Sequence, residues 1–132
     1  MRNFLSVVVG LIVGMGVNMA LIKVNEALYA MPEGVSYEDQ EAFQAWIDTL
    51  PAPAFLIVMA AHLGQALVGG WVAARLGSSR PVQLALVVGA LSMVGGLMML
   101  MTVQGALWMW AEVPLYLLLA AAAGRAVQRS RA

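Results

Sequence analysis

Long uncharged stretches separated by short charged segments dominate the pattern along this chain. The stretches cover residues 4–22, 53–74 and 81–124, and only Glu112 interrupts the last one with a charge. A helix rises about 1.5 Å per residue and the hydrocarbon core of a bilayer is about 30 Å thick, so one crossing needs about 20 residues. The first two stretches are each long enough for one crossing and the third for two. The pattern therefore predicts four membrane-spanning helices.

Turn signals indicate where these helices end. Pro32 and Gly34 close the first helix, and residues 77–81 form a polar turn between the second and the third. We expect a single transmembrane domain over residues 1–132. Its spanning helices are predicted at about residues 4–28, 54–76, 82–102 and 107–127. Because Glu112 and Pro114 both lie near the beginning of the last helix, its start remains open between Leu107 and Ala111.

A shorter amphipathic helix is predicted at about residues 37–50. Ser36 precedes it as a cap-like residue, with the acid Asp39 three positions later. Apolar side chains follow at helical spacing, and we expect them to lie in the headgroup region with the acids facing water. These interfacial residues are Phe43, Trp46, Ile47 and Leu50.

Charge predicts the orientation of the four crossings. Arg2 precedes the first predicted helix, Arg75 and Arg80 flank the turn after the second, and three more arginines follow the last helix. In contrast, six of the seven acids lie within residues 26–48. Positive charge favours the cytoplasmic side of a membrane. We therefore expect an all-α, polytopic four-helix bundle with both termini cytoplasmic and the short helix extracytoplasmic. The expected location is a bacterial inner membrane.

Composition narrows the function classes. Hydrophobic residues make up 62% of the chain and charged residues 11%, which is far from a soluble domain. The formal net charge is zero, and no basic stripe offers a nucleic-acid site. The chain has no cysteine, which excludes thiol chemistry and cysteine-ligated metals. One histidine and one intramembrane glutamate do not make an ordinary zinc site, so we expect no metal and no cofactor.

Small residues recur at one-turn spacing in every predicted span. Such residues let helix backbones approach closely in lipid. The spacing favours contacts within one bundle and leaves open a homodimer seam on one ridge. The predicted packing residues are Gly10, Gly14, Ala66, Gly70, Ser92, Gly96, Ala120 and Gly124.

A few polar side chains lie at membrane depth, where such groups are costly and often functional. Counting by helix rise places all of them in the outer half of the bilayer, where they could meet. A contact between His62 and Glu112 would make a proton or cation relay, while hydrogen bonds that fix helix register are the alternative. The cluster comprises Asn18, His62, Gln65 and Glu112.

Several short segments resemble uncharacterised small bacterial four-helix integral membrane proteins. They are the Gly10 and Gly14 pair, the exit at residues 29–32, residues 49–51, residues 69–75, and Ala-Gly-Arg at 123–125. The resemblance implies the fold but no activity. Small multidrug transporters are similar in size only, because their membrane carboxylate lies in the first helix, where this chain has Asn18.

The sequence thus favours a non-enzymatic structural or accessory protein that binds lipid or protein partners in a bilayer. It leaves open assembly into a homo-oligomer or a larger membrane complex. The alternative is an oligomeric proton-coupled transporter or channel that uses Glu112 and His62. No serine elbow, phosphate loop or paired aspartates point to an enzyme.

Overall fold

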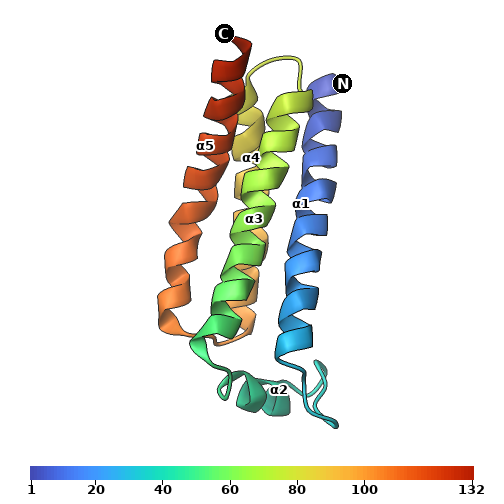
Figure 1. The fold of residues 1–132 in the computed structure, drawn as a ribbon, viewed down its shortest axis with the longest axis vertical. Coiled ribbons are helices and arrows are strands. Elements are labelled where there is room, and N and C mark those ends of the chain that lie inside the picture. Colours follow the sequence, from blue (N-terminus) through green and yellow to red (C-terminus); the bar gives the residue numbers. More distant parts are fainter.

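Four long helices run side by side and a short one lies across one end of them (Figure 1). The computed structural model describes all 132 residues and contains no strand. The elements are α1 (Arg2–Leu28), α2 (Gln40–Ile47), α3 (Ala52–Leu76), α4 (Pro81–Thr102), the 3-10 helix η1 (Leu107–Ala111) and α5 (Glu112–Arg131). The all-α four-helix architecture predicted from the sequence is confirmed.

Four helical segments are long and apolar enough to cross a bilayer: α1, α3, α4, and η1 continued by α5. Their outward faces carry large apolar side chains such as Phe4, Ile12 and Met15 on α1 and Met98 and Met101 on α4. Exposed apolar surface of this extent fits lipid as the surrounding solvent. The chain is therefore a multi-pass membrane protein.

The two ends of the bundle differ in charge. Both termini and the turn between α3 and α4 lie at one end, which we call the terminal end, and α2 lies at the other, the α2 end (Figure 1). Arg2, Arg75 and Arg80 belong to the terminal end, whereas the acids of residues 33–48 belong to the α2 end. Both termini lie at the same end because the chain passes along the bundle an even number of times.

The short helix is shorter than the expected 37–50, because its cap differs. The side chain of Asp39 accepts a hydrogen bond from the backbone N–H of Ala42 at 3.0 Å, so Asp39 and not Ser36 begins the helix. Ser36 instead accepts from Glu38 N–H in the preceding turn, at 3.1 Å. At the other end, backbone bonds from Thr49 to Trp46 and from Leu50 to Ile47 form turns.

The last crossing begins as a 3-10 helix and becomes α-helical at Glu112. Pro114 consequently falls in the first turn of α5, where a missing N–H breaks no helical hydrogen bond. This resolves where the last α-helix starts. At its other end α5 continues to Arg131, beyond the expected residue 127. One reason is that the Arg131 guanidinium donates to the carbonyls of Ala74, Arg75 and Gly77 at 2.8–2.9 Å, which ties α5 to the end of α3.

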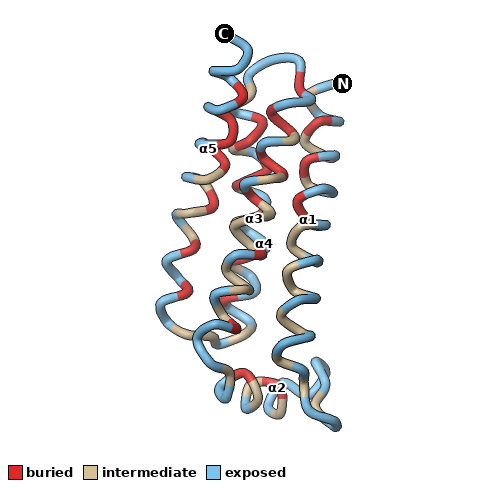
Figure 2. Tube along the Cα trace, viewed as in Figure 1, coloured by how far each residue is buried: buried red, intermediate tan, exposed pale blue.

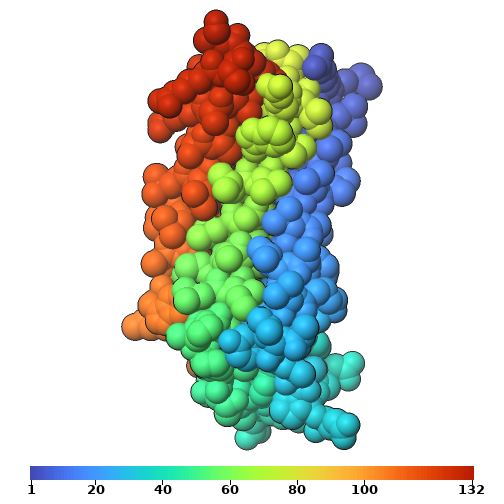
Figure 3. Space-filling view, viewed as in Figure 1, coloured from blue at the N-terminus to red at the C-terminus, as the bar shows by residue number.

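Backbone contact at small residues joins α1 to α3 and α3 to α4 and α5. A Cβ placed on Gly10 would lie 2.5 Å from the carbonyl oxygen of Gly69, and one on Gly14 would lie 2.6 Å from that of Gln65. Gly70 faces Ala85 of α4 and Ala120 of α5. The space-filling view shows α1 and α3 in contact along the visible face (Figure 3).

The remaining predicted packing residues lie inside the same bundle. A Cβ on Gly124 would lie 2.6 Å from Cα of Val82, and one on Gly96 would overlap the hydroxyl of Tyr116. Ala66 and Ala120 have no exposed surface, and Ser92 is 4% exposed. The small-residue ridges are thus occupied by contacts within one chain.

Packing is tighter at the terminal end than at the α2 end. Figure 2 shows buried residues gathered toward the termini, with more exposed and intermediate ones toward α2. Near the terminal end, Val7 and Leu11 of α1 pack against the buried Leu84 and Val88 of α4. At the opposite end a cavity opens between the helices, and α2 covers it.

Candidate functional site

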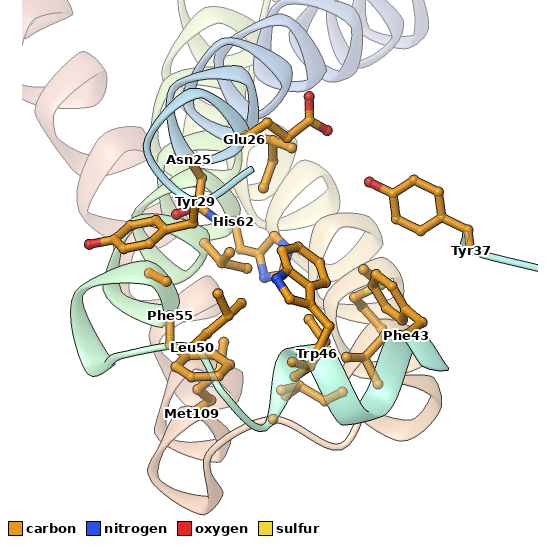
Figure 4. A pocket seen from close by; sticks show the side chains of 18 residues that line it. Asn25, Glu26, Tyr29, Tyr37, Phe43, Trp46, Leu50, Phe55, His62 and Met109 are labelled. Atoms are coloured by element: carbon orange, nitrogen blue, oxygen red, sulfur yellow. The ribbon is translucent and has the colours of Figure 1, made fainter. Parts of the chain in front are cut away.

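A cavity of about 140 Å³ lies at the α2 end, among α1, α3, α4 and the covering α2 (Figure 4). Most of its wall is apolar. In α1, α2 and α3 the lining side chains recur at intervals of three or four residues, which places them on one helical face. The helices contribute Ile22, Asn25 and Glu26 from α1, Phe43, Trp46 and Ile47 from α2, Ala54, Phe55, Val58 and His62 from α3, Met99 and Leu100 from α4, and Met109 from η1. Tyr29, Tyr37, Leu50, Val103 and Gly105 line the cavity from the segments between helices.

The α2 helix is held over the cavity by a side-chain amide. Gln44 donates from Nε2 to the carbonyl of Gln104 at 2.7 Å and accepts at Oε1 from the Gln104 N–H at 3.0 Å. This pairing fixes α2 to the connection that follows α4. Phe43 and Ile47, 7% and 9% exposed, turn inward from α2, and Trp46 projects from it into the pocket (Figure 4).

The residues predicted to be interfacial face the bundle. Phe43, Trp46 and Ile47 of α2, and Leu50 just after it, line the protein's own cavity. The physical reason is that α1, α3 and α4 separate at this end of the bundle. Their inward apolar side chains then form the nearest apolar surface against which α2 can pack.

His62 and Glu112 are brought together, as the hypothesis of a relay requires. His62 Nδ1 and Glu112 Oε1 are 3.1 Å apart, and the Tyr116 hydroxyl donates to the same oxygen at 3.4 Å. The rings of His62 and Tyr116 are stacked, with centroids 6.5 Å apart. Glu112 has no exposed surface, and its Oε2 has no hydrogen-bond partner. The arrangement can hold a proton between an imidazole and a carboxylate.

Two elements position Glu112. It is the first residue of α5, where the positive end of the helix dipole favours a carboxylate. Tyr116 follows one turn later on the same face and covers the carboxylate from within α5. His62 reaches it from α3 and also lines the cavity, so this one side chain connects the cavity to the buried acid.

The other two members of the predicted cluster lie apart from this pair. Gln65 donates to the Ser92 hydroxyl at 3.3 Å, one turn further along α3. Asn18 is partly exposed on α1 and does not line the cavity. The structure thus separates the four residues into a His62–Glu112 pair, a Gln65–Ser92 pair and a lone Asn18.

The sequence reasoning missed Asn25 as a site residue. Asn25 lines the cavity, and its Oδ1 is buried without a hydrogen-bond partner. Its spacing from Ile22 on α1, and from Tyr29 just after the helix, was a usable signal, because these residues line the same cavity. Glu26, the neighbouring acid, is paired with the exposed Lys23 at 2.6 Å.

No group of three or more His, Asp or Glu side chains lies close enough to hold a metal ion. Comparisons with known proteins give no matching family, no matching curated protein and no matching solved structure. The fold by itself defines a class: a small multi-pass membrane protein with an apolar cavity at one end that a short helix covers.

Proposed function

We propose that this chain is a non-enzymatic protein of a bacterial inner membrane that binds a lipophilic molecule in the cavity beneath α2. Both termini lie in the cytoplasm, so the cavity opens toward the extracytoplasmic half of the bilayer. The observation that carries the proposal is the cavity itself, which is mostly apolar, lies between four helices and has few polar groups in its wall. Binding sites for small molecules share these properties.

The size of the cavity supports a small occupant. Apolar cavities of about 150 Å³ bind benzene, so one of about 140 Å³ accommodates a single ring or a short length of hydrocarbon chain. The remainder of a longer molecule stays in the bilayer. The protein then acts as an accessory component that holds one end of a lipid or similar amphiphile.

A cavity-filling variant tests this function. Val58→Phe places a ring in the cavity wall, whereas Leu56→Phe adds the same ring to an exposed position on the same helix. We expect hexylbenzene to change the fluorescence of Trp46 in purified wild-type protein and in Leu56→Phe. Val58→Phe should weaken this binding by at least about tenfold, a loss of about 1.4 kcal/mol.

Trp46→Phe identifies which part of the fluorescence change comes from the cavity, because the chain has four tryptophans. Native mass spectrometry of the detergent-extracted protein would report a co-purifying lipid and the number of copies in the particle. Equal binding by the Val58→Phe and Leu56→Phe variants would contradict the proposed site.

The His62–Glu112 contact favours a second candidate, a proton-coupled transporter or channel. A buried carboxylate next to a histidine that lines the cavity offers a point of proton entry. In proteoliposomes, proton-driven flux should fall strongly in Glu112→Gln and His62→Ala. Flux that is unchanged in both variants would exclude this candidate without affecting ligand binding.

A further inference from the structure

We propose that the cavity selects an uncharged lipophile whose head is a single hydroxylated ring, with the hydroxyl donating to Oδ1 of Asn25. The inference rests on the proposed function and names the ligand class of the same site. Three properties of the cavity carry it: its size and aromatic wall, the hydrogen-bonding character of its polar atoms, and its charge.

The wall is suited to a ring. Phe43 and Trp46 from α2 and Phe55 from α3 surround a space about the size of one benzene molecule. Aromatic side chains gain from offset or edge-to-face contact with another ring beyond the gain from buried area. A flexible chain would fill the same volume but would give up more conformational freedom on binding.

One polar atom of the cavity lacks a hydrogen-bond donor, which a ligand can supply. Asn25 Oδ1 is a hydrogen-bond acceptor that is buried and unpaired, which costs free energy until a donor reaches it. His62 uses Nδ1 to contact Glu112, so only Nε2 remains for a ligand. If Nδ1 carries the proton shared with the carboxylate, Nε2 of the neutral ring is also an acceptor. A hydroxyl satisfies either atom.

The charges around the cavity favour a neutral head. Neither lysine nor arginine lines it, so an anionic head has no partner. The fully buried Glu112 behind His62 would repel such a head further. A cationic head would need a free carboxylate, but Glu26 is already paired with Lys23 and Glu112 with His62. An uncharged head has neither difficulty.

Three ring-headed probes with the same tail distinguish this ligand class: para-hexylphenol, para-hexylanisole and hexylbenzene. Only the phenol can donate a hydrogen bond. Wild-type protein should bind the phenol about tenfold more tightly than the anisole, which corresponds to about 1.4 kcal/mol. Affinity is read from the Trp46 fluorescence change.

Asn25→Leu keeps a side chain of similar size and removes the acceptor. It should abolish the preference for the phenol while hexylbenzene still binds. Asn18→Leu is the matched control, because it makes the same change on α1 away from the cavity lining, and it should retain the preference.

The outcomes separate this inference from the proposed function. If hexylbenzene binds but the phenol and the anisole bind equally in wild type, the cavity stands and the selectivity is wrong. Tighter binding of para-hexylbenzoate or para-hexylbenzylammonium than of the phenol also overturns the inference. If none of the probes binds, the proposed function itself fails. Loss of the preference in Asn18→Leu as well would remove Asn25 from the recognition.

Discussion

Glu112 concentrates the polar chemistry of this membrane protein in one side chain. It is fully buried, it contacts His62 and Tyr116 through Oε1, and its Oε2 is left without a partner. A carboxylate in such a place costs free energy, and the helix dipole and the two hydrogen bonds offset part of that cost. Substitution of Glu112 should therefore change the stability of the protein, and its contact with His62 can be measured as a coupling free energy.

A double-mutant cycle measures how strongly His62 and Glu112 are coupled. We expect His62→Ala and Glu112→Ala each to destabilise the protein, and the double variant to be less destabilised than their sum by about 1 kcal/mol, the order found for polar contacts in membranes. Unfolding in mixed detergent micelles provides the measurement.

Lys23 and Glu26 provide the control cycle, because they form a shorter but exposed contact. Their coupling should be near zero to about 0.5 kcal/mol. A His62–Glu112 coupling no larger than that of the control would contradict a stabilising contact.

The sequence predicted part of this site for a physical reason. Counting residues along the helices predicted His62 and Glu112 in the same half of the bilayer, where they could meet. Counting does not give the rotation of a helix about its axis, because packing sets that rotation. Asn18 lies one turn beyond the close contact at Gly14, on the part of α1 where the bundle opens. Asn25 was missed for a similar reason, because the cavity that it lines is closed by α2, a tertiary contact.

At the scale of elements, α1 provides a matched pair of glycines. Gly10 faces the backbone of α3, where a Cβ would lie 2.5 Å from the Gly69 carbonyl oxygen, whereas no atom lies within 4 Å of a Cβ at Gly16. We expect Gly10→Ala to destabilise the protein by about 1–3 kcal/mol, the usual cost of overpacking. Gly16→Ala should be neutral or stabilising by up to about 1 kcal/mol, because alanine favours helix.

Thermal unfolding of the purified protein in detergent compares the two variants under the same conditions. Equal stability of Gly10→Ala and wild type would mean that α1 is not held to α3 by backbone contact. Loss of stability in Gly16→Ala would instead point to a contact on the outer face of α1.

The helices could be predicted because turn signals and the lengths of the uncharged stretches are local features of the sequence. Which helix packs against which could not be predicted from them. Small residues at one-turn spacing occur in all four spans, and the sequence does not say which ridge meets which. The ends of α2 depended on a choice between two caps, Ser36 and Asp39, which the tertiary contacts of Phe43 and Gln44 help to decide. The last crossing starts as the 3-10 helix η1, which buries Met109 in the cavity wall, and local sequence does not reveal such a tertiary contact.

At the scale of the whole molecule, the two ends of the bundle carry opposite charge. Six of the seven basic residues are arginines, and all of them lie in the halves of the helices or turns nearest the terminal end. The acids of the loop and of α2 gather at the other end. A bilayer with the terminal end in the cytoplasm agrees with the preference of arginine for that side. With that orientation, the ligand proposed above would enter from the extracytoplasmic leaflet.

Single cysteines test this orientation in a chain that has none of its own. Glu41→Cys lies on the exposed side of α2, and Gln128→Cys lies on the exposed side of α5 near the C-terminus. A membrane-impermeant maleimide should label Glu41→Cys in intact spheroplasts and leave Gln128→Cys unlabelled. Inverted vesicles should give the opposite result, because they expose the cytoplasmic face, and detergent should allow both to react.

The reverse labelling pattern would place the cavity on the cytoplasmic side. The fold and the cavity would be unchanged by that result, but the ligand would then enter from the inner leaflet and the arginine bias would have failed as a guide. Labelling of both sites from the same side in sealed membranes would be more serious. It would mean that the bundle does not cross the bilayer as its length and apolar surface indicate, since α2 and the C-terminus lie at opposite ends of the structure.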